Sequence, residues 1–316
     1  MKKILIGLIT VICIAIFMVG CRAKEQSIET GKIESTVEKD KNKASEEVFT
    51  EFIKVLETSD SLKTKEFIVD NIEKVSEEIA DKMVREYELL LNTNFDKLEG
   101  RYFNAINEMN EGRKLDLEKI KDEKIKDEVK KTVTSGYTFK MREGAHYLTI
   151  DYAMIADNFS QYLSKNLKPY YELRKKDQQK PIFNGEYINV DVEEVKNRVV
   201  TLEKAIKDNR GLANREDIKD LMKWHIQALL TISHFNKDVD FETGKVNDSV
   251  KNAYKELKES DLKISKYAAE EMDKLLTEYK FVIKQDGGEA YKKVNSLKFK
   301  IVDEVGKKVE EYYLVK

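Results

Sequence analysis

The chain has 316 residues, of which 57 are basic and 59 are acidic, so its formal net charge at pH 7 is only −2. A nearly balanced charge excludes the excess of Lys and Arg by which nucleic-acid-binding proteins neutralise phosphates. Charged residues make up 37% of the chain and proline occurs only twice, a composition that favours long helices with solvated faces.

The first twenty residues are organised as a secretory signal peptide. Lys2 and Lys3 precede the apolar segment 4–20, whose length is at the lower limit for a helix that crosses a membrane. This segment ends in the sequence MVGC at residues 18–21. The ending resembles the lipobox of bacterial lipoproteins, in which the signal peptide is cut before a cysteine that carries a diacylglycerol. It departs from the pattern only at Met18, where leucine usually stands.

The lipobox resemblance implies that the mature chain begins at a lipidated Cys21 on the extracytoplasmic face of the cell membrane. Two acyl chains give firm membrane anchoring, whereas a single chain binds only marginally. Cys13 leaves with the signal peptide, so no thiol remains for a disulfide. The alternative is an uncleaved anchor helix with Cys21 unmodified, which would place the rest of the chain on the same side of the membrane.

Residues 21–45 are polar, lack aromatic side chains and contain only scattered Ile and Val. Such a segment buries too little apolar area to offset the conformational entropy that ordering costs. We therefore expect a disordered tether between the membrane and the folded part of the chain.

Beyond the tether, apolar residues recur at steps of three and four, the spacing that places side chains on one face of an α-helix. The clearest stripes lie in residues 68–90, 192–206, 218–232, 264–282 and 290–312. Each stripe needs a partner surface, so the helices must pack on one another. The sequence therefore predicts an all-α fold, arranged as a multi-helix bundle or a short α-solenoid.

One segment interrupts the helical pattern. Residues 132–152 are rich in β-formers around a plausible tight turn, and residues 137–150 are expected to form a small β-hairpin. We take this hairpin as the boundary between an N-terminal helical region (46–133) and a C-terminal helical domain (134–316). After the hairpin, residues 152–173 predict a helix that ends or kinks near Pro169.

From the hairpin onward the chain resembles an uncharacterised helical domain found in exported proteins and lipoproteins of Gram-positive bacteria. The resemblance rests on GYTFKMREGAHYLTIDY (136–152), YLS (162–164), Pro181 and DFETGKV (240–246). It implies a helical extracytoplasmic module and carries no catalytic residue that can be transferred to this chain.

The sequence offers little metal or catalytic chemistry. His225 and His234 are nine residues apart, which places them on opposite faces of a helix, and His146 stands alone. The acidic loop 236–248 fails the calcium-loop pattern, because Thr243 stands where glycine is needed and Ser249 where a bidentate Glu is needed. Motifs for nucleophilic catalysis, for phosphate binding and for dinucleotide binding are also missing. We therefore expect no metal, no cofactor and no catalysis.

Aromatic residues are concentrated between residues 137 and 187. They are Tyr137, Phe139, Tyr147, Tyr152, Phe159, Tyr162, Tyr170, Tyr171, Phe183 and Tyr187. Tyr152, Phe159 and Tyr162 follow helical spacing, so filling of the core is the main interpretation, and a face that stacks on sugar rings or grips a peptide is the alternative. The best candidate for an exposed contact surface is Tyr170 and Tyr171 with the neighbouring Arg174 and Lys175.

These patterns together favour a membrane-anchored lipoprotein that acts as a non-catalytic binding or scaffolding module at the cell envelope. Its expected partners are the membrane, through the lipid, and an envelope protein or cell-wall polymer. Two alternatives remain open: an envelope enzyme that acts on cell-wall polymer in a Tyr-rich cleft, and a solute-capturing lipoprotein.

Overall fold

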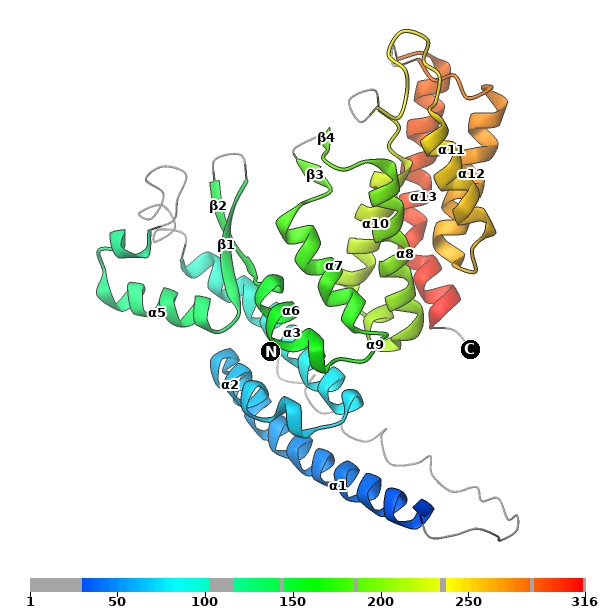
Figure 1. The fold of residues 1–316 in the computed structure, drawn as a ribbon. Coiled ribbons are helices and arrows are strands. Elements are labelled where there is room, and N and C mark those ends of the chain that lie inside the picture. The colour runs from blue at the N-terminus through cyan, green and yellow to red at the C-terminus, as the bar shows by residue number, and fades with distance from the viewer. Residues whose placement is uncertain are drawn as a thin grey trace, which may run out of the picture. The chain divides into compact units, whose positions relative to one another are not determined.

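The computed structural model describes residues 30–102, 116–142, 145–184, 187–233, 237–284 and 287–314 (Figure 1). Cys21 and the apolar leader lie outside the described residues. The chain divides into two compact units, residues 1–41 and Asn42–Lys316. The α-helices are α1 (Thr30–Leu56), α2 (Ser61–Asn71), α3 (Glu77–Arg101), α5 (Glu123–Thr134), α6 (Tyr152–Phe159), α7 (Lys168–Gln179), α8 (Val192–Asp208), α9 (Arg210–Ala213), α10 (Glu216–Leu230), α11 (Asp248–Glu259), α12 (Lys263–Glu278) and α13 (Glu289–Tyr313).

The predicted all-α class with one hairpin near residues 137–150 is confirmed. Strand β1 (Tyr137–Arg142) pairs antiparallel with β2 (Ala145–Ile150). A second, two-residue pair, β3 (Phe183–Asn184) with β4 (Tyr187–Ile188), was not foreseen. Isolated hairpins are marginal in water. The first hairpin is held against α3, because the Tyr137 hydroxyl donates to the Leu91 carbonyl oxygen at 2.7 Å.

Helix α1 begins inside the segment for which composition predicted a disordered tether. Residues 30–45 are helical in the structure, whereas residues 21–29 lie outside the described residues. The segment is rich in Lys and Glu, which have high intrinsic helix propensity, and α1 continues into Phe52, which is fully buried. Low apolar content therefore indicated weak burial here without excluding a helix.

The apolar stripe over residues 68–90 belongs to two helices rather than one. Helix α2 ends at Asn71, the short 3-10 helix η1 (Ile72–Lys74) follows, and α3 starts after Ser76. The Ser76 hydroxyl accepts from the backbone N–H of Ile79, and this capping bond satisfies one of the donors left open at a helix start. Periodicity alone cannot reveal such a break, because the stripe resumes in phase beyond it.

The helix expected over residues 152–173 is also divided. Helix α6 ends at Phe159, the 3-10 helix η3 (Ser160–Tyr162) follows, and α7 starts at Lys168. Pro169 thus lies in the first turn of α7 and not near the end of a helix. Its missing N–H costs nothing at that position and its fixed φ favours the helix, so here proline starts a helix.

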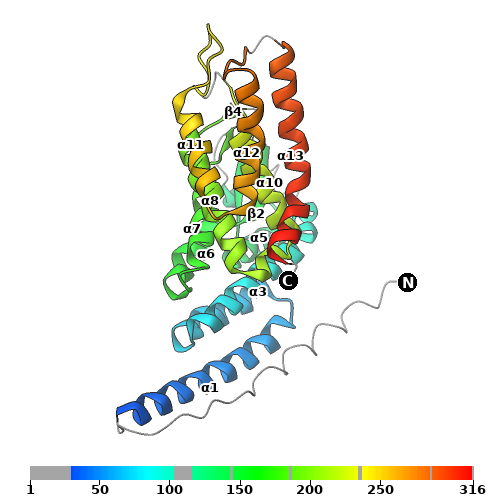
Figure 2. The same cartoon turned by 90° about the vertical axis from the view of Figure 1, so that its right-hand side faces the viewer.

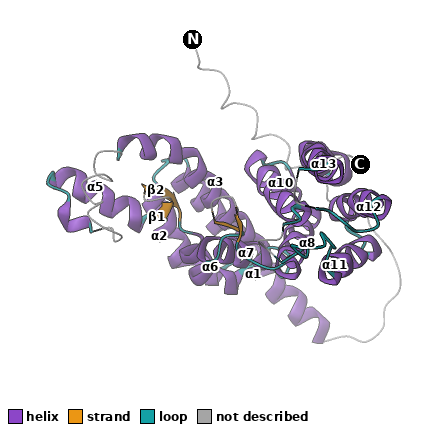
Figure 3. Cartoon of the chain, turned by 90° about the horizontal axis from the view of Figure 1, so that it is seen from above, coloured by secondary structure: helices purple, strands orange, loops and turns teal. Residues whose placement is uncertain are grey.

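Helices α8, α10, α11, α12 and α13 pack on one another as a bundle (Figures 2 and 3). Helix α8 is capped by Asp191, whose carboxylate accepts from the backbone N–H of Glu194. A second carboxylate caps α12 from another helix. Glu203 of α8 is fully buried and accepts from the backbone N–H groups of Ile264 and Ser265.

One large hydrophobic core runs through the described part of residues 42–316, beside a small second cluster of Tyr102, Ile120 and Val129. It includes Phe52 and Tyr87 before the hairpin, and Met222 and Val309 after it. The core therefore crosses residue 134, where the sequence suggested a boundary between two helical regions. Among the described residues, no helix combines the length and the apolar character that a membrane crossing requires.

The turn before β1 depends on glycine. Gly136 has a φ of +111°, and a Cβ there would lie 2.2 Å from the Tyr87 hydroxyl, which donates to the Ser135 carbonyl oxygen at 2.6 Å. We expect Gly136→Ala to lower the free energy of unfolding by about 2 kcal/mol or more, through backbone strain and the lost hydrogen bond. Urea denaturation measures this difference.

Gly287→Ala is the matched control. Gly287 also has a positive φ of +78°, but nothing lies within 4 Å of its Cβ position. Only the strain of the left-handed conformation is added there, about 1 kcal/mol. Equal losses for the two variants would show that the contact with Tyr87 does not contribute.

Candidate functional site

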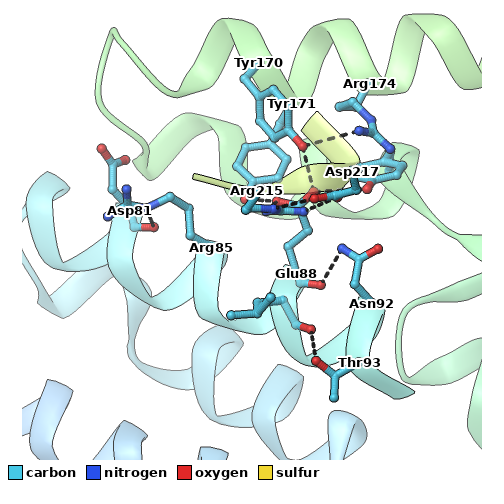
Figure 4. A network of polar contacts seen from close by, with 12 residues as sticks. Asp81, Arg85, Glu88, Asn92, Thr93, Tyr170, Tyr171, Arg174, Arg215 and Asp217 are labelled. Carbon is cyan, nitrogen blue, oxygen red and sulfur yellow. Dashed lines mark hydrogen bonds and ion pairs between the residues drawn. The ribbon is translucent and has the colours of Figure 1, made fainter. Parts of the chain in front are cut away.

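The most polar feature of the core is a carboxylate on α3. Glu88 is fully buried, with no exposed surface, yet it lies among tyrosine and arginine side chains from α6, α7 and the start of α10 (Figure 4). A buried charge of this kind is tolerated only when it is paired and hydrogen-bonded. The surroundings of Glu88 meet that requirement from several helices at once.

Each oxygen of the Glu88 carboxylate accepts two hydrogen bonds. Oε1 accepts from the hydroxyls of Tyr170 at 2.7 Å and Tyr152 at 3.0 Å. Oε2 accepts from Nη1 of Arg215 at 2.7 Å and from the hydroxyl of Tyr171 at 3.1 Å. The four donors saturate the strongest acceptor positions of the group.

Two arginines supply the positive charge around this carboxylate. Arg215 also forms a bidentate pair with Asp217, with distances of 3.0 Å from Nε to Oδ1 and 2.6 Å from Nη2 to Oδ2. The Arg174 guanidinium stacks over the Tyr152 ring, with its central carbon 3.9 Å from the ring centroid. Stacking of this kind is a favourable cation–π contact. We call Glu88, Tyr152, Tyr170, Tyr171, Arg174, Arg215 and Asp217 the Glu88 network.

The electrostatics keep Glu88 ionised. Burial by itself raises the pKa of the Glu88 carboxyl. The charges of Arg215 and Arg174 and the hydrogen bonds to the carboxylate lower this pKa by more than burial raises it, so the net shift of the pKa is downward. Burial and the Glu88 charge raise the pKa values of Tyr170 and Tyr171 well above the ordinary tyrosine value. The tyrosines therefore stay protonated and donate their hydroxyl protons to the Glu88 carboxylate.

A second buried cluster lies between α7, α8 and α10. Asp177 Oδ1 accepts from Nη1 of Arg198 at 2.8 Å, and Asp177 Oδ2 lies 3.1 Å from Nε2 of His225. Arg198 Nε also donates to Glu194 at 2.7 Å. Burial raises the pKa of Asp177, but His225 and Arg198 lower it more strongly, so it falls below the ordinary value. This cluster pins three helices together.

His225 is a core histidine and not a metal ligand among the described residues. Its side chain is buried, and Nδ1 lies 2.8 Å from the carbonyl oxygen of Leu221, one helical turn earlier. His234 lies outside the described residues, and the structure describes no side chain for His146. Among the described residues, no three His, Cys, Asp or Glu side chains come together as a metal site.

The predicted contact surface is wrong for its two tyrosines. Tyr170 and Tyr171 are fully buried and bind Glu88, so neither can touch a partner. Arg174 is half-buried within the Glu88 network, and Lys175 forms an ion pair with Asp157. The sequence showed two adjacent tyrosines beside a charged stretch. It could not show that both hydroxyls donate to the same buried carboxylate.

The ten aromatic residues divide between core and surface. Tyr152 and Phe159 are buried, as the helical spacing predicted, whereas Tyr147 and Tyr187 are exposed. The Tyr-rich region does enclose a desolvated carboxylate, but tyrosine and arginine side chains fill the space around it. Glu88 is therefore placed to hold helices together rather than to exchange a proton with a substrate.

A shallow cavity of about 230 Å³ opens elsewhere, between α8 and the turn from α11 to α12. Its walls carry Lys196 and Glu256, which form an ion pair with each other, and apolar residues such as Leu257. The charged groups of the pair already satisfy one another. The cavity lies on a different group of helices from the Glu88 network.

Comparisons with known proteins give no further guidance: no protein family, no curated protein and no solved structure matches the chain.

Replacing Glu88 by Gln removes one charge and leaves the Arg215 guanidinium facing a neutral amide. We expect Glu88→Gln to lower the free energy of unfolding by about 3 kcal/mol, because the substitution breaks a buried ion pair and leaves Asp217 as the partner of Arg215. Chemical denaturation followed by circular dichroism gives the difference. Glu78→Gln is the control on the same helix; its exposed pair with Lys82 should contribute little.

The lowered pKa values also predict how stability depends on pH. Glu88, Asp177 and Asp217 all have pKa values below the ordinary range in the folded protein. Their stabilisation is complete above the unfolded carboxyl pKa of about 4 and is lost as the pH falls from there through the folded values. Denaturation at a series of pH values should show this loss, with a smaller slope in Glu88→Gln. An equal slope in both proteins would contradict the assignment to Glu88.

Proposed function

We propose that the chain is a lipoprotein anchored on the extracytoplasmic face of a cell membrane, and that its helical unit is a non-catalytic binding or scaffolding module. The observation that carries the anchor is the ending of the apolar leader in MVGC at residues 18–21. A basic start, an apolar segment and a lipobox-like ending together favour export and lipidation over a buried helix.

The absence of cysteine pairing fits this proposal. The chain has two cysteines, and after leader removal only Cys21 would remain, consumed by lipid. An exported protein without disulfides has to be stable through its core alone. The core of residues 42–316 meets that requirement, because it extends from α1 to α13 and contains the hydrogen-bonded clusters around Glu88 and Asp177.

The polar chemistry of the core supports binding over catalysis. Catalytic acids and bases need pKa values near the working pH and access to the substrate. The Glu88 carboxylate is instead fully buried, four-fold hydrogen-bonded and held ionised. Buried and fully hydrogen-bonded groups of this kind make the core rigid. Binding of partners would then take place on the surface of the protein.

Mass spectrometry of the native protein tests the anchor. We expect the N-terminal peptide to start at Cys21 and to carry the added mass of a diacylglycerol, with the protein extracted from membranes only by detergent. The Cys21→Ser variant should retain residues 1–20 and lack acyl chains, because the modified sulfur is required before the leader is cut.

Cys13→Ser is the matched control. It removes the other thiol, which lies inside the leader, and should be processed like the native protein. A native protein with an intact leader and an unmodified Cys21 thiol, or one recovered from the cytosol, would overturn the proposal.

A further inference from the structure

Two loops meet at one end of the helix bundle. One connects α10 to α11 and the other connects α12 to α13 (Figures 1 and 2). Their backbones are hydrogen-bonded to each other: the N–H of Val246 donates to the Phe281 carbonyl at 2.9 Å, and the N–H of Ile283 donates to the Gly244 carbonyl at 2.6 Å. We call residues 237–247 and 279–284 the double loop.

The double loop has a strained backbone. Lys237, Lys280 and Phe281 have φ values of 61°, 54° and 57°, and only Ser59 shares this feature among the described non-glycine residues. A left-handed conformation is an outlier for a bulky residue such as phenylalanine, and strain persists only where the surroundings over-determine it. Strained segments of this kind are concentrated at functional sites, so the double loop is a candidate functional site.

The double loop also exposes an aromatic side chain to solvent. Phe241 is 76% exposed, more than any other large hydrophobic residue that the structure describes, and Val282 of the other loop is 38% exposed. Phe241 follows Asp240, whose carboxylate accepts from the N–H and the hydroxyl of Thr243 at 2.8 and 2.6 Å. Phe241 lies within this local turn, whose loop is hydrogen-bonded to the second loop, and we call its position the apex of the double loop.

The double loop also carries several exposed lysines. Four exposed lysines lie on the double loop, and none of their ammonium groups forms an ion pair with another described residue: Lys237, Lys245, Lys280 and Lys284. Within residues 237–247 and 279–284 the exposed carboxylates are those of Asp240 and Glu242. The solvated surface of the double loop is therefore positive, with an exposed apolar centre.

We propose that the double loop contacts a membrane that contains anionic lipid, with Phe241 and Val282 in the headgroup layer and the lysines on lipid phosphates. An aromatic ring gains from partial burial at the membrane interface. Lysine stems lie along apolar surface while their ammonium groups stay in the polar layer. Anionic lipids attract such basic clusters, and the attraction weakens with salt.

A lipid surface fits this arrangement better than a protein partner does. Stable protein interfaces bury about 800 Å² on each side around a hydrophobic centre. The double loop offers only two exposed apolar side chains together with exposed charged residues. This apolar area is too small for the centre of a protein interface. The inference rests on the proposed function only in that the anchor keeps the protein near a membrane.

A tryptophan at the apex reports the contact directly. Trp224 is the only tryptophan of the chain, so the double variant Phe241→Trp, Trp224→Phe carries a single indole at the apex. The full chain is reconstituted in vesicles of equal parts phosphatidylglycerol and phosphatidylcholine. We expect the emission of the indole to shift to the blue in these vesicles. Brominated lipids should quench this emission several-fold more strongly in the anionic vesicles than in vesicles of phosphatidylcholine alone.

Two controls make the result specific. In the chain with only Trp224, emission should be the same in both kinds of vesicle, because Trp224 lies on α10 and outside the double loop. Replacing the four lysines of the double loop by Gln should abolish the added quenching, as should high salt.

An apex indole that stays solvent-like in anionic vesicles overturns the inference. A shift that appears without lipid, on addition of an acidic polymer or an envelope protein, assigns the double loop to that partner and also overturns it. The mass of the N-terminal peptide distinguishes failure of the anchor from failure of the membrane contact. A lipidated Cys21 together with a solvent-like indole at residue 241 rejects only the membrane contact.

Discussion

The structure depends on one buried charge. Glu88 lies at the centre of residues 42–316 with no contact to solvent, and its ionised carboxylate is acceptable there only because Arg215 and three tyrosine hydroxyls converge on it. Those donors come from α6, α7 and the start of α10, so the helices have to meet in one arrangement for any of them to be satisfied. Apolar packing alone tolerates several arrangements, whereas a saturated carboxylate tolerates few. The Asp177 cluster repeats the same principle between α7, α8 and α10.

The helical class and the hairpin followed from the sequence because both depend on local sequence patterns. The stripes over 192–206 and 290–312 have the length and spacing of single helices, and the segment around 137–150 is rich in β-formers on both sides of a turn. The breaks at Ser76 and before Pro169 did not follow, because a cap or an N-terminal proline changes the chain direction without disturbing the apolar phase. The start of α1 was missed because composition measures burial and says little about helix formation in Lys- and Glu-rich segments.

The buried networks could not be predicted. Glu88 is one of 59 acidic residues, and its partner Arg215 stands 127 residues away. Nothing in the neighbourhood of either residue marks it as internal. The only available signal was the density of tyrosines, which correctly indicated a core around Tyr152 and Phe159 but gave no reason to expect hydroxyls pointing at a carboxylate. For the same reason Tyr170 and Tyr171 were placed on the surface. The exposure of Phe241 was equally hidden, since it depends on how two distant loops bond to each other.

The separation between Glu88 and Arg215 has a consequence for biogenesis. A growing chain that ends before residue 215 contains α3 and all three tyrosine donors, yet it lacks the cation that balances the carboxylate. Closing so long a loop costs entropy that only the completed core returns. The first two-thirds of the chain is therefore expected to stay loosely packed, and so open to proteases and chaperones, until the start of α10 has been made.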